Sequence, residues 1–324
     1  MGARGEASSV VCAMNVLLTG GCGFLGGHFQ ERLGRRWNII NVDKLSYAAS
    51  RWREGAIDCP IEKLTAELLP DVRFDVVVNL ASESHVDNSI AGPMEFASNY
   101  VGTANILELA RKLGIATFVQ MSTDEVTGAL GPETPPTDEL SPIVTSSPYS
   151  ASKAAAELLA LAYHKTYGMD VRIVRSTNLY GSWQHPEKFI PRAITYALSG
   201  RSIPLYGDGN QTRDWLEVTE AVRGIYFVIT RGIAGRVYCL GAENEIENRY
   251  LVEWIAKELD ARIEHVADRL GHDFRYATNN SRAKIELGMG PFYRLNSETI
   301  KHVILWYREN EPEWRAMIDR GGRW

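Results

Sequence analysis

The hydrophobic pattern of this chain alternates between short runs that are apolar at nearly every position and longer stretches with helical spacing. A run that is apolar at successive positions is typical of a strand buried on both faces, as in a parallel sheet covered by helices. The pattern predicts six such strands, at residues 15–18, 37–42, 74–79, 116–121, 171–176 and 236–240. Because crossovers between parallel strands are right-handed, we expect an α/β fold with a Rossmann-like, doubly wound parallel sheet.

Two parts of the chain depart from this rhythm. Residues 128–148 are rich in Pro, Ser, Thr and Gly, which predicts a loop over the carboxyl edge of the sheet. Beyond Tyr180 the spacing becomes irregular and prolines recur, which fits a smaller C-terminal lobe. The expected division is a first domain of residues 14–178, a return to it at about 214–245, and a second lobe of residues 179–213 and 246–324.

The composition excludes several classes of protein. With 324 residues, 45% hydrophobic and 23% charged, the chain has the make-up of an ordinary globular protein. A net charge of −5 argues against a nucleic-acid or anionic membrane surface, but it leaves room for a local basic pocket. No apolar run approaches the roughly 20 residues of a membrane span. The apolar stretch 10–14 is too short for a signal sequence, so we expect a loose leader, a possible alternative start at Met14 and a cytoplasmic protein.

The cysteines give no sign of a metal site. Cys12, Cys22, Cys59 and Cys239 show neither CxxC nor any other metal-ligand spacing. We expect free thiols in a reducing cytosol rather than a disulfide, and no bound metal.

A glycine-rich turn follows the first predicted strand. Residues 19–26 read TGGCGFLG, so Gly20, Gly23 and Gly26 stand between a strand and a helix. Glycines there let the backbone turn tightly and approach a pyrophosphate, which lies on the amides of the helix N-terminus. A turn without a ligand has the same spacing, but Asp43 ends the second strand about 20 residues on, where a carboxylate accepts hydrogen bonds from the adenosine ribose. Because a carboxylate repels a 2′-phosphate, we predict NAD rather than NADP, although Lys44 follows directly.

Small and polar residues, NLASESHVD, follow the third predicted strand at residues 79–87. Small side chains at this place would let the cofactor cross the edge of the sheet. His85 is a candidate base by residue type, but its neighbours indicate ligand positioning, and that is the role we expect of it.

Tyr149 and Lys153 are spaced i, i+4 in the sequence SPYSASK, so on a helix they share one face. A phenol has an unperturbed pKa near 10 and is a poor base at neutral pH. A nearby ammonium, with the positive nicotinamide of NAD⁺, would favour the phenolate, and Lys153 can also hold the nicotinamide ribose. The alternative is a surface Tyr–Lys pair. It is disfavoured because Ser122 and Thr123 end a neighbouring strand in a chain with a dinucleotide fingerprint.

At this point the chain resembles the extended short-chain dehydrogenase/reductase superfamily and, within it, the NDP-glucose 4,6-dehydratases. The similarity runs from about residue 14 to residue 290. It is carried by TGGCGFLG, NVDKLSYA, ASESHVDNSI, STDEV, YSASKAAAE, TNLYGSWQHPEKFIP, GDGNQTRDWLEV and DRLGHDFRY. The combination of STDE with PEK and GHDxRY is not expected in an epimerase or reductase of the same fold.

The resemblance implies a complete reaction. Tyr149 would take the proton of the sugar 4-hydroxyl while hydride passes to NAD⁺, and Thr123 would hydrogen-bond the developing oxyanion. The 4-keto group acidifies C5, so that Glu125 would remove the C5 proton while Asp124 protonates the departing 6-hydroxyl. Hydride then returns to C6. An acid and a base side by side need pKa values that their surroundings push apart.

The resemblance also carries over binding residues. The expected cofactor contacts are Gly20, Gly23, Phe24, Leu25, Gly26, Asp43, Lys44, Ser46, Asp58, Leu80, Ala81, Ser82, Ser84, Tyr149, Lys153 and Asn178. The expected contacts to a nucleotide sugar, dTDP-glucose or UDP-glucose, are Ser84, Thr123, Asn178, Glu187, Lys188, Pro204, Tyr206, Arg213, Asn248, His272 and Asp273, most of them in the second lobe. A cation such as Arg213 opposite a diphosphate is what such a lobe needs.

The chain departs from the family pattern at a few positions. Thr127 stands where a Tyr is usual after STDEV, and Leu179 replaces the second Asn of the TNLYG stretch. The segment between Tyr47 and Pro70 is shorter than usual, and the acidic residue expected near the adenine is Ala56, with Asp58 displaced. These departures affect the adenine contacts and the choice of sugar more than the type of reaction.

The resemblance further implies a homodimer. Residues 149–167 are rich in Ala, and residues from about 99 to 113 form a second helix with small and apolar side chains. Small side chains permit close helix packing, and in this superfamily two such helices from each subunit form the interface. Packing within one chain is the alternative.

Three other functions remain as alternatives to 4,6-dehydration of an NDP-glucose. A dehydratase could act on another NDP-hexose. A nucleotide-sugar 4-epimerase would need only Tyr149 and Lys153, so Asp124 and Glu125 argue against it. A catalytically silent NAD-binding protein would have lost part of the Tyr, Lys and Thr set, which is intact here.

Overall fold

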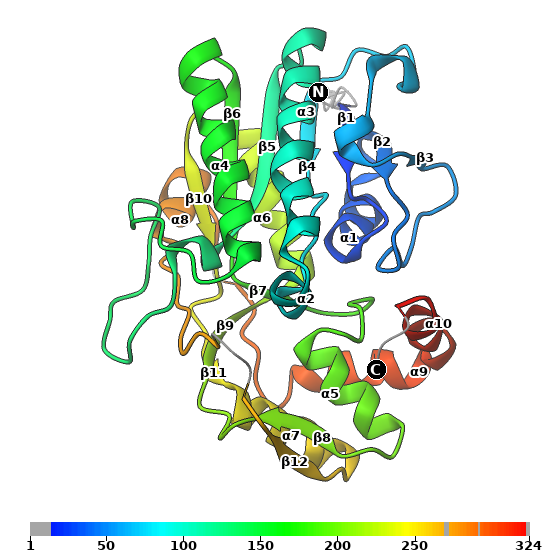
Figure 1. Cartoon of the computed structure of the whole chain (residues 1–324), viewed down its shortest axis with the longest axis vertical. Coiled ribbons are helices and arrows are strands. Elements are labelled where there is room, and N and C mark those ends of the chain that lie inside the picture. The colour runs from blue at the N-terminus through cyan, green and yellow to red at the C-terminus, as the bar shows by residue number, and fades with distance from the viewer. Residues whose placement is uncertain (1–13, 269–271, 291, 322–324) are drawn as a thin grey trace, which may run out of the picture.

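The computed structural model describes residues 14–268, 272–290 and 292–321 (Figure 1). The loose leader expected at the N-terminus, and Cys12 within it, lie outside the described residues. Seven parallel strands form the main sheet in the order β10-β6-β5-β4-β1-β2-β3. Their bounds are β1 Asn15–Thr19, β2 Asn38–Asp43, β3 Ile57–Asp58, β4 Val76–Asn79, β5 Thr117–Thr123, β6 Asp170–Ser176 and β10 Val237–Leu240. The predicted fold class and all six predicted strands are confirmed; β3, only two residues long, was missed.

Helices cover both faces of the sheet because successive strand side chains point to opposite sides. Val16 and Leu18 face one core, together with side chains of α1 (Phe24–Leu33) and α6 (Val218–Arg231). Leu17, between them, faces the other core, which α3 (Ala97–Leu113) and α4 (Pro148–Tyr167) complete. In Figure 1, α3 and α4 stand side by side in front of the sheet. The continuous apolar runs in the sequence are therefore strands buried on two sides.

Local signals fix the bounds of α4, which begins one residue before Tyr149. Ser147 is its N-cap and forms a capping box with Ser150, and Pro148 occupies the first turn, where its missing N–H has no cost. The helix ends at Gly168, whose φ of 69° suits glycine. Tyr149 and Lys153 are thus held one turn apart on a helix with defined ends.

The second lobe is built from short pieces below the sheet in Figure 1. Its strands form two small sheets, β11-β9-β7 and β12-β8. Their bounds are β7 Asn178–Tyr180, β8 Ile203–Tyr206, β9 Thr212–Glu217, β11 Glu245–Glu247 and β12 Ile263–Val266. The helices are α5 Phe189–Leu198, α7 Asn248–Leu259, α9 Ile300–Glu309 and α10 Glu311–Gly321. These elements share an apolar core that includes the fully buried Trp314 and Tyr307.

Residues 246–324 were expected in the second lobe. Within this range, α8 (Ser281–Leu287) packs on α6 and β10. Its Ala283 and Leu287 belong to the core of the main sheet.

Residues 128–147 of the predicted loop contain no helix or regular strand, and α4 begins at Pro148, its last residue. Isolated bridges join it to the second lobe, from Leu130 to Arg275 and from Thr137 to Thr278. The loop therefore connects the two parts of the molecule beside the carboxyl edge of the sheet.

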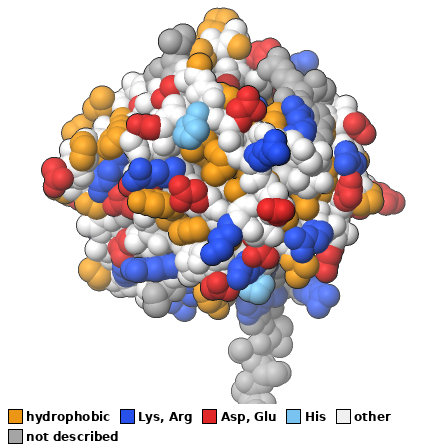
Figure 2. Space-filling view, turned by 90° about the horizontal axis from the view of Figure 1, so that it is seen from below, with side chains coloured by type: hydrophobic (Ala, Val, Ile, Leu, Met, Phe, Trp, Pro, Cys, Tyr) orange, Lys and Arg blue, Asp and Glu red, His pale blue; other side chains and the backbone are white. Residues whose placement is uncertain are grey.

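Within the described part of the chain, no helix is long and apolar enough to cross a membrane. Cys22, Cys59 and Cys239 are free and buried. Basic and acidic side chains are interspersed on the face of the molecule seen in Figure 2.

Candidate active site

A cavity of about 380 Å³ opens at the carboxyl edge of the main sheet and is closed on its other side by the second lobe. Most of the expected site residues line it: Gly20, Gly23, Phe24, Leu25, Gly26, Asp43, Lys44, Ser46, Leu80, Ala81, Ser82, Ser84, Thr123, Asp124, Glu125, Tyr149, Lys153, Asn178, Glu187 and Lys188. Seven do not: Asp58, Pro204, Tyr206, Arg213, Asn248, His272 and Asp273. The fold thus brings residues from both parts of the chain to one space.

The glycine turn leaves room for a phosphate. Gly20 has a φ of +71°, and a Cβ on it would lie 2.7 Å from the Ala81 amide nitrogen. A Cβ on Gly26 would lie 2.3 Å from the Gly20 carbonyl oxygen. Gly23, the N-cap of α1, has no side chain to cap the helix, and the first turn of α1 holds no acidic residue. The amides at this helix end are therefore available to an anion, as a dinucleotide pyrophosphate requires.

Asp43 lies at the end of β2, where an adenosine ribose would be held. Its two carboxylate oxygens accept hydrogen bonds from the Cys22 and Leu45 amides, each at 2.9 Å. Burial raises the pKa of Asp43, and these two bonds offset part of that effect. Lys44, next in the chain, forms an ion pair with Glu83 across the cavity. Asp58 pairs with Asp43 in the sheet but is exposed and does not line the cavity.

Asp124 and Glu125 begin a short 3₁₀ helix, η4 (Asp124–Thr127), directly after β5. Thr123 caps it: its hydroxyl accepts from the Glu125 amide at 3.3 Å and donates to Asp124 Oδ1 at 3.2 Å. Asp124 Oδ2 is buried without a hydrogen-bond partner. Burial, and next the charges of Glu125 and Asp214, raise the pKa of Asp124 well above its usual value. Its surroundings therefore favour the neutral acid form of Asp124 beside a second carboxyl group.

Tyr149 and Lys153 both line the cavity, as their spacing predicts. Burial, and next Glu125 and Asp124, raise the pKa of Tyr149, whereas a hydrogen bond with Thr123 lowers it. Lys153 is not among the groups that shift this pKa, which departs from the expectation that its ammonium favours the phenolate. Its Nζ instead donates to the Met121 carbonyl oxygen at 2.8 Å, and burial lowers its pKa to about 8. The protein alone keeps Tyr149 as a neutral phenol.

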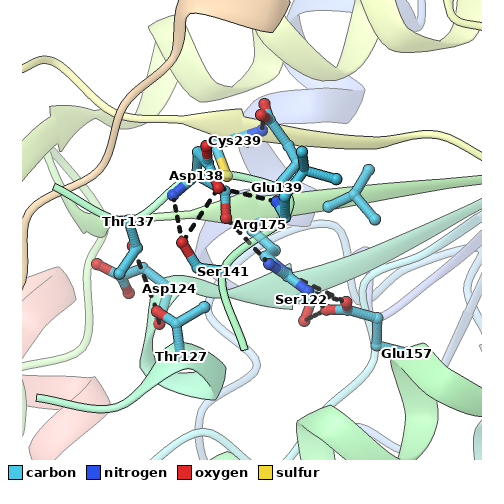
Figure 3. A network of polar contacts seen from close by, with 12 residues as sticks. Ser122, Asp124, Thr127, Thr137, Asp138, Glu139, Ser141, Glu157, Arg175 and Cys239 are labelled. Atoms are coloured by element: carbon cyan, nitrogen blue, oxygen red, sulfur yellow. Dashed lines mark hydrogen bonds and ion pairs between the residues drawn. The ribbon is translucent and has the colours of Figure 1, made fainter. Parts of the chain in front are cut away.

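A buried ion pair behind the site was not foreseen from the sequence. Glu157, four residues after Lys153 on α4, is fully buried and binds Arg175 of β6, with Oε1 2.7 Å from Nη2 (Figure 3). The Ser122 hydroxyl donates to Glu157 Oε2 at 2.6 Å. Glu157 raises the pKa of Lys153 and so opposes the effect of burial. The one available signal was the spacing of Lys153 and Glu157, which places both on the buried face of α4.

We predict that Glu157→Gln lowers the free energy of unfolding by about 3–5 kcal/mol, because removing one partner leaves the other charge buried and unpaired. Urea unfolding measures this change. The double variant Glu157→Leu with Arg175→Met should recover much of the loss, since it leaves no unpaired charge. Glu108→Gln, at the exposed Glu108–Arg111 pair, is the control and should change little. Equal effects of Glu157→Gln and the control would refute the prediction.

Asn99 of α3 is a second residue that the sequence did not single out. It is buried, and its Oδ1 accepts from the Glu83 amide at 2.7 Å while its Nδ2 donates to the Ser152 hydroxyl at 2.9 Å. These bonds tie the loop after β4 to α4. No pattern in the sequence shows that these three segments meet.

His85 is the N-cap of α2 (Val86–Ala91), and its Nδ1 accepts from the Asn88 amide at 3.3 Å. Its Nε2 lies 4.0 Å from a carboxylate oxygen of Glu187, which also accepts from the Tyr47 hydroxyl. Burial and next the charge of Lys188 lower the pKa of His85. These contacts support a positioning role.

The remaining expected substrate contacts gather in the second lobe. Arg213 donates to the carbonyl oxygens of Thr212 and Asp273, both at 2.8 Å. Tyr206 and His272 meet edge to face, with ring centroids 6.1 Å apart. Pro204 lies on β8, and Asn248 begins α7 with its Oδ1 buried and unpartnered.

Two of the departures from the family pattern lie at the site. The Thr127 hydroxyl donates to the Asp124 carbonyl oxygen at 2.7 Å and to the Thr137 hydroxyl at 3.3 Å, so it ties η4 to the following loop. Leu179 lines the cavity. Thr127 is thus smaller than the usual Tyr, and Leu179 is more apolar than the usual Asn, beside Asp124 and Glu125.

Comparison with known proteins identifies the family of the chain. The model of the NAD dependent epimerase/dehydratase family matches residues 16–241. A dTDP-glucose 4,6-dehydratase of Streptomyces griseus is 39% identical, over 95% of this chain and 98% of the relative. One of Mycolicibacterium smegmatis is 40% identical, over 94% of this chain and 97% of the relative.

Solved structures extend the comparison to the fold. The dTDP-glucose 4,6-dehydratase DesIV of Streptomyces venezuelae, solved with NAD bound, has a TM-score of 0.87 at 39% identity. The match covers 94% of this chain and all of DesIV. A UDP-glucose 4-epimerase of Thermotoga maritima has a TM-score of 0.86 at 25% identity, over 92% of this chain and all of the epimerase. The chain therefore belongs to the NAD dependent epimerase/dehydratase family and groups within it with the dTDP-glucose 4,6-dehydratases.

Proposed function

We propose that this protein is an NAD-using hydro-lyase that converts dTDP-glucose to the 4-keto-6-deoxy sugar nucleotide. The observation that carries this proposal is the buried Asp124, whose Oδ2 has no hydrogen-bond partner, beside Glu125 and Tyr149. Oxidation at C4 needs only a base at O4, whereas loss of water needs an acid and a second base as well. The site contains all three groups, and 39% identity to dehydratases supports the same reaction.

Each side chain has a role that follows from its contacts. The positive charge of bound NAD⁺ would favour the phenolate of Tyr149. As the phenolate, Tyr149 accepts the proton of the 4-hydroxyl, and Thr123, which hydrogen-bonds Tyr149, donates a hydrogen bond to the oxygen as it becomes a carbonyl. Glu125 takes the C5 proton, which the neighbouring carbonyl has made acidic. Asp124, kept protonated by burial, gives its proton to the departing 6-hydroxyl. Glu125 then returns a proton to C5.

NAD fits the cavity beside these groups, and when bound it supplies the hydride acceptor for C4 and the donor for C6. The glycine turn before α1 would hold its pyrophosphate and Asp43 its adenosine ribose. Lys153 would hold the nicotinamide ribose. Its ammonium is held in place by the hydrogen bond that it donates to the Met121 carbonyl oxygen, near the end of β5.

Mass spectrometry of the products distinguishes the candidate reactions. The purified holoenzyme is incubated separately with dTDP-glucose and with UDP-glucose. A product lighter by one water, formed faster from dTDP-glucose, is expected. Faster conversion of UDP-glucose would overturn the choice of nucleotide. An isomer of unchanged mass, separated by chromatography before mass spectrometry, would indicate the epimerase, and recovery of both compounds unaltered would refute the proposal.

We place this reaction in the cytoplasm. Cys22, Cys59 and Cys239 are free thiols. Unpaired thiols suit a reducing compartment.

The protein is expected to be a homodimer through α3 and α4. Tyr100 and Val101 on α3 and Leu158 on α4 are 42%, 50% and 52% exposed, so the paired helices present large apolar side chains to solvent. Light scattering should give twice the mass of one chain. Val101→Lys with Leu158→Lys should shift the mass toward the monomer, and Ile285→Lys, at an 81% exposed position on α8, should not. A monomer mass for the unaltered protein at micromolar concentration would contradict the dimer.

A further inference from the structure

A cation in the second lobe lies close to the cavity and has no carboxylate partner among the described residues. It is Arg192, on the first turns of α5. The other cations nearby are engaged: Lys188 pairs with Glu187 and donates to the Ser84 carbonyl oxygen, and Arg213 donates to backbone carbonyls.

The surroundings of Arg192 are aromatic and neutral. Its Cζ lies 5.5 Å from the centre of the Tyr196 ring, and its Nε is buried without a hydrogen-bond partner. Burial acts to lower the pKa of Arg192, but hydrogen bonds with the Tyr196 and Tyr206 side chains outweigh it, so the pKa is raised. The side chain is therefore charged, and its side-chain hydrogen-bond partners are two tyrosines rather than carboxylates.

The helix around Arg192 adds to the positive potential. The Arg192 amide bonds to the Lys188 carbonyl oxygen at 2.8 Å, so the two cations lie one turn apart on the same face. The first turn of α5 holds no acidic residue, and no side chain caps it. Two cations at the positive end of a helix favour an anion between or beside them.

Arg192 does not line the cavity itself, but it lies one turn of α5 from the cavity residue Lys188 and has neighbours in both parts of the site. Its charge acts on His85, which contacts the cavity residue Glu187. On the other side it reaches Tyr206, whose ring meets His272. A nucleotide sugar with its hexose beside Tyr149 and its nucleoside in the second lobe would pass its diphosphate through this region.

A partly buried charge without a counter-ion is unfavourable unless an anion completes it. We propose that Arg192 binds the diphosphate of the nucleotide sugar and contributes to the preference for nucleoside diphosphates over less charged nucleotides. This role rests on the proposed function, which supplies a substrate with a diphosphate. Arg213 then fixes the segment 272–276 through its backbone bonds and need not provide the whole charge.

The test compares Arg192→Met with Arg201→Met in the NAD-loaded enzyme. Arg201 is a matched control, because its Cζ lies over the same Tyr196 ring at 4.1 Å while the residue is exposed. Calorimetric titrations use thymidine diphosphate, thymidine monophosphate and thymidine. Arg192→Met should weaken binding of the diphosphate by about 10- to 100-fold, the monophosphate less and thymidine hardly at all. Arg192→Lys should fall between the wild type and Arg192→Met, because the charge remains without the planar fork.

Each result bears on a different proposal. Equal weakening of the diphosphate and thymidine by Arg192→Met would place Arg192 at the base and overturn the inference. So would a loss no larger than that of Arg201→Met. If the unaltered protein binds no thymidine diphosphate or uridine diphosphate, the proposed function fails first. An unchanged melting temperature and NAD content of Arg192→Met would exclude a folding defect, and a raised KM for dTDP-glucose with little change in kcat is the expected kinetic result.

Discussion

Tyr149→Phe is expected to stop the reaction before any 4-keto sugar forms. The phenol is the group that accepts the proton of the 4-hydroxyl, and no other hydroxyl of α4 lines the cavity among the described residues. Without a base at O4 the hydride cannot leave C4, so neither elimination nor hydride return can follow. Loss of a positioned acid–base group lowers rates by about 10²- to 10⁴-fold. We therefore expect kcat to fall by at least that range and no NADH absorbance to appear on adding substrate.

Tyr163→Phe is the matched control for this variant. Tyr163 lies on the same helix but packs on Tyr167, away from the cavity, so its loss of a hydroxyl should leave kcat unchanged. Thymidine diphosphate should bind Tyr149→Phe as it binds the wild type. Product formation by Tyr149→Phe at more than about a tenth of the wild-type rate would show that another group is the base.

The paired variant Asp124→Asn with Glu125→Gln should divide the reaction in two. Tyr149, Thr123 and Lys153 remain, so oxidation at C4 proceeds. Loss of water needs the proton of Asp124 and the base Glu125, and neither carboxyl group is present. The enzyme should therefore accumulate NADH, visible by its nicotinamide absorbance, while no 4-keto-6-deoxy sugar is released. Because the hydride is borrowed and returned in one turnover, the cofactor need not leave, and the NADH should stay with the protein.

The amide at position 124 is close in shape to the protonated acid that burial favours there, so the variant should fold. Glu133→Gln, on the exposed part of the following loop, controls for loss of a carboxylate near the site and should release product at the normal rate. If the paired variant formed the deoxy product at close to the wild-type rate, Asp124 and Glu125 would not be the acid and base, and an epimerase-like role for the site would regain support.

Sequence patterns that span only a few residues were sufficient to predict much of the fold. Each main strand is an apolar run buried on two faces, so the sheet could be predicted without knowledge of its neighbours. β3 was missed because a strand of two residues produces no recognisable hydrophobic pattern, and no pattern in the sequence indicates that α8 packs against the main sheet.

Part of the candidate site could likewise be predicted from patterns of short range, and part could not. Gly20, Gly23 and Gly26 carry their own signal, because a strand, a tight turn and a helix are adjacent in sequence. Tyr149 and Lys153 share a helix face by spacing alone. The reaction itself came from a resemblance in several motifs, which no periodicity would have supplied.

The parallel sheet, the dinucleotide turn and the pair on α4 could be predicted from sequence patterns, because each depends on residues within a few turns or one strand. The electrostatics of the site depend on the folded structure. The pKa of Asp124 is raised because the fold buries it and because Glu125 and, from β9, Asp214 place negative charge near it. Glu157, one turn further along α4, raises the pKa of Lys153 against the effect of burial. Glu157 is itself paired with Arg175, which comes from β6. In the part of the chain that the structure describes, Arg192 has no carboxylate partner, although acidic residues are common in the sequence. Burial and electric fields are sums over distant neighbours, and those neighbours exist only once the chain is folded.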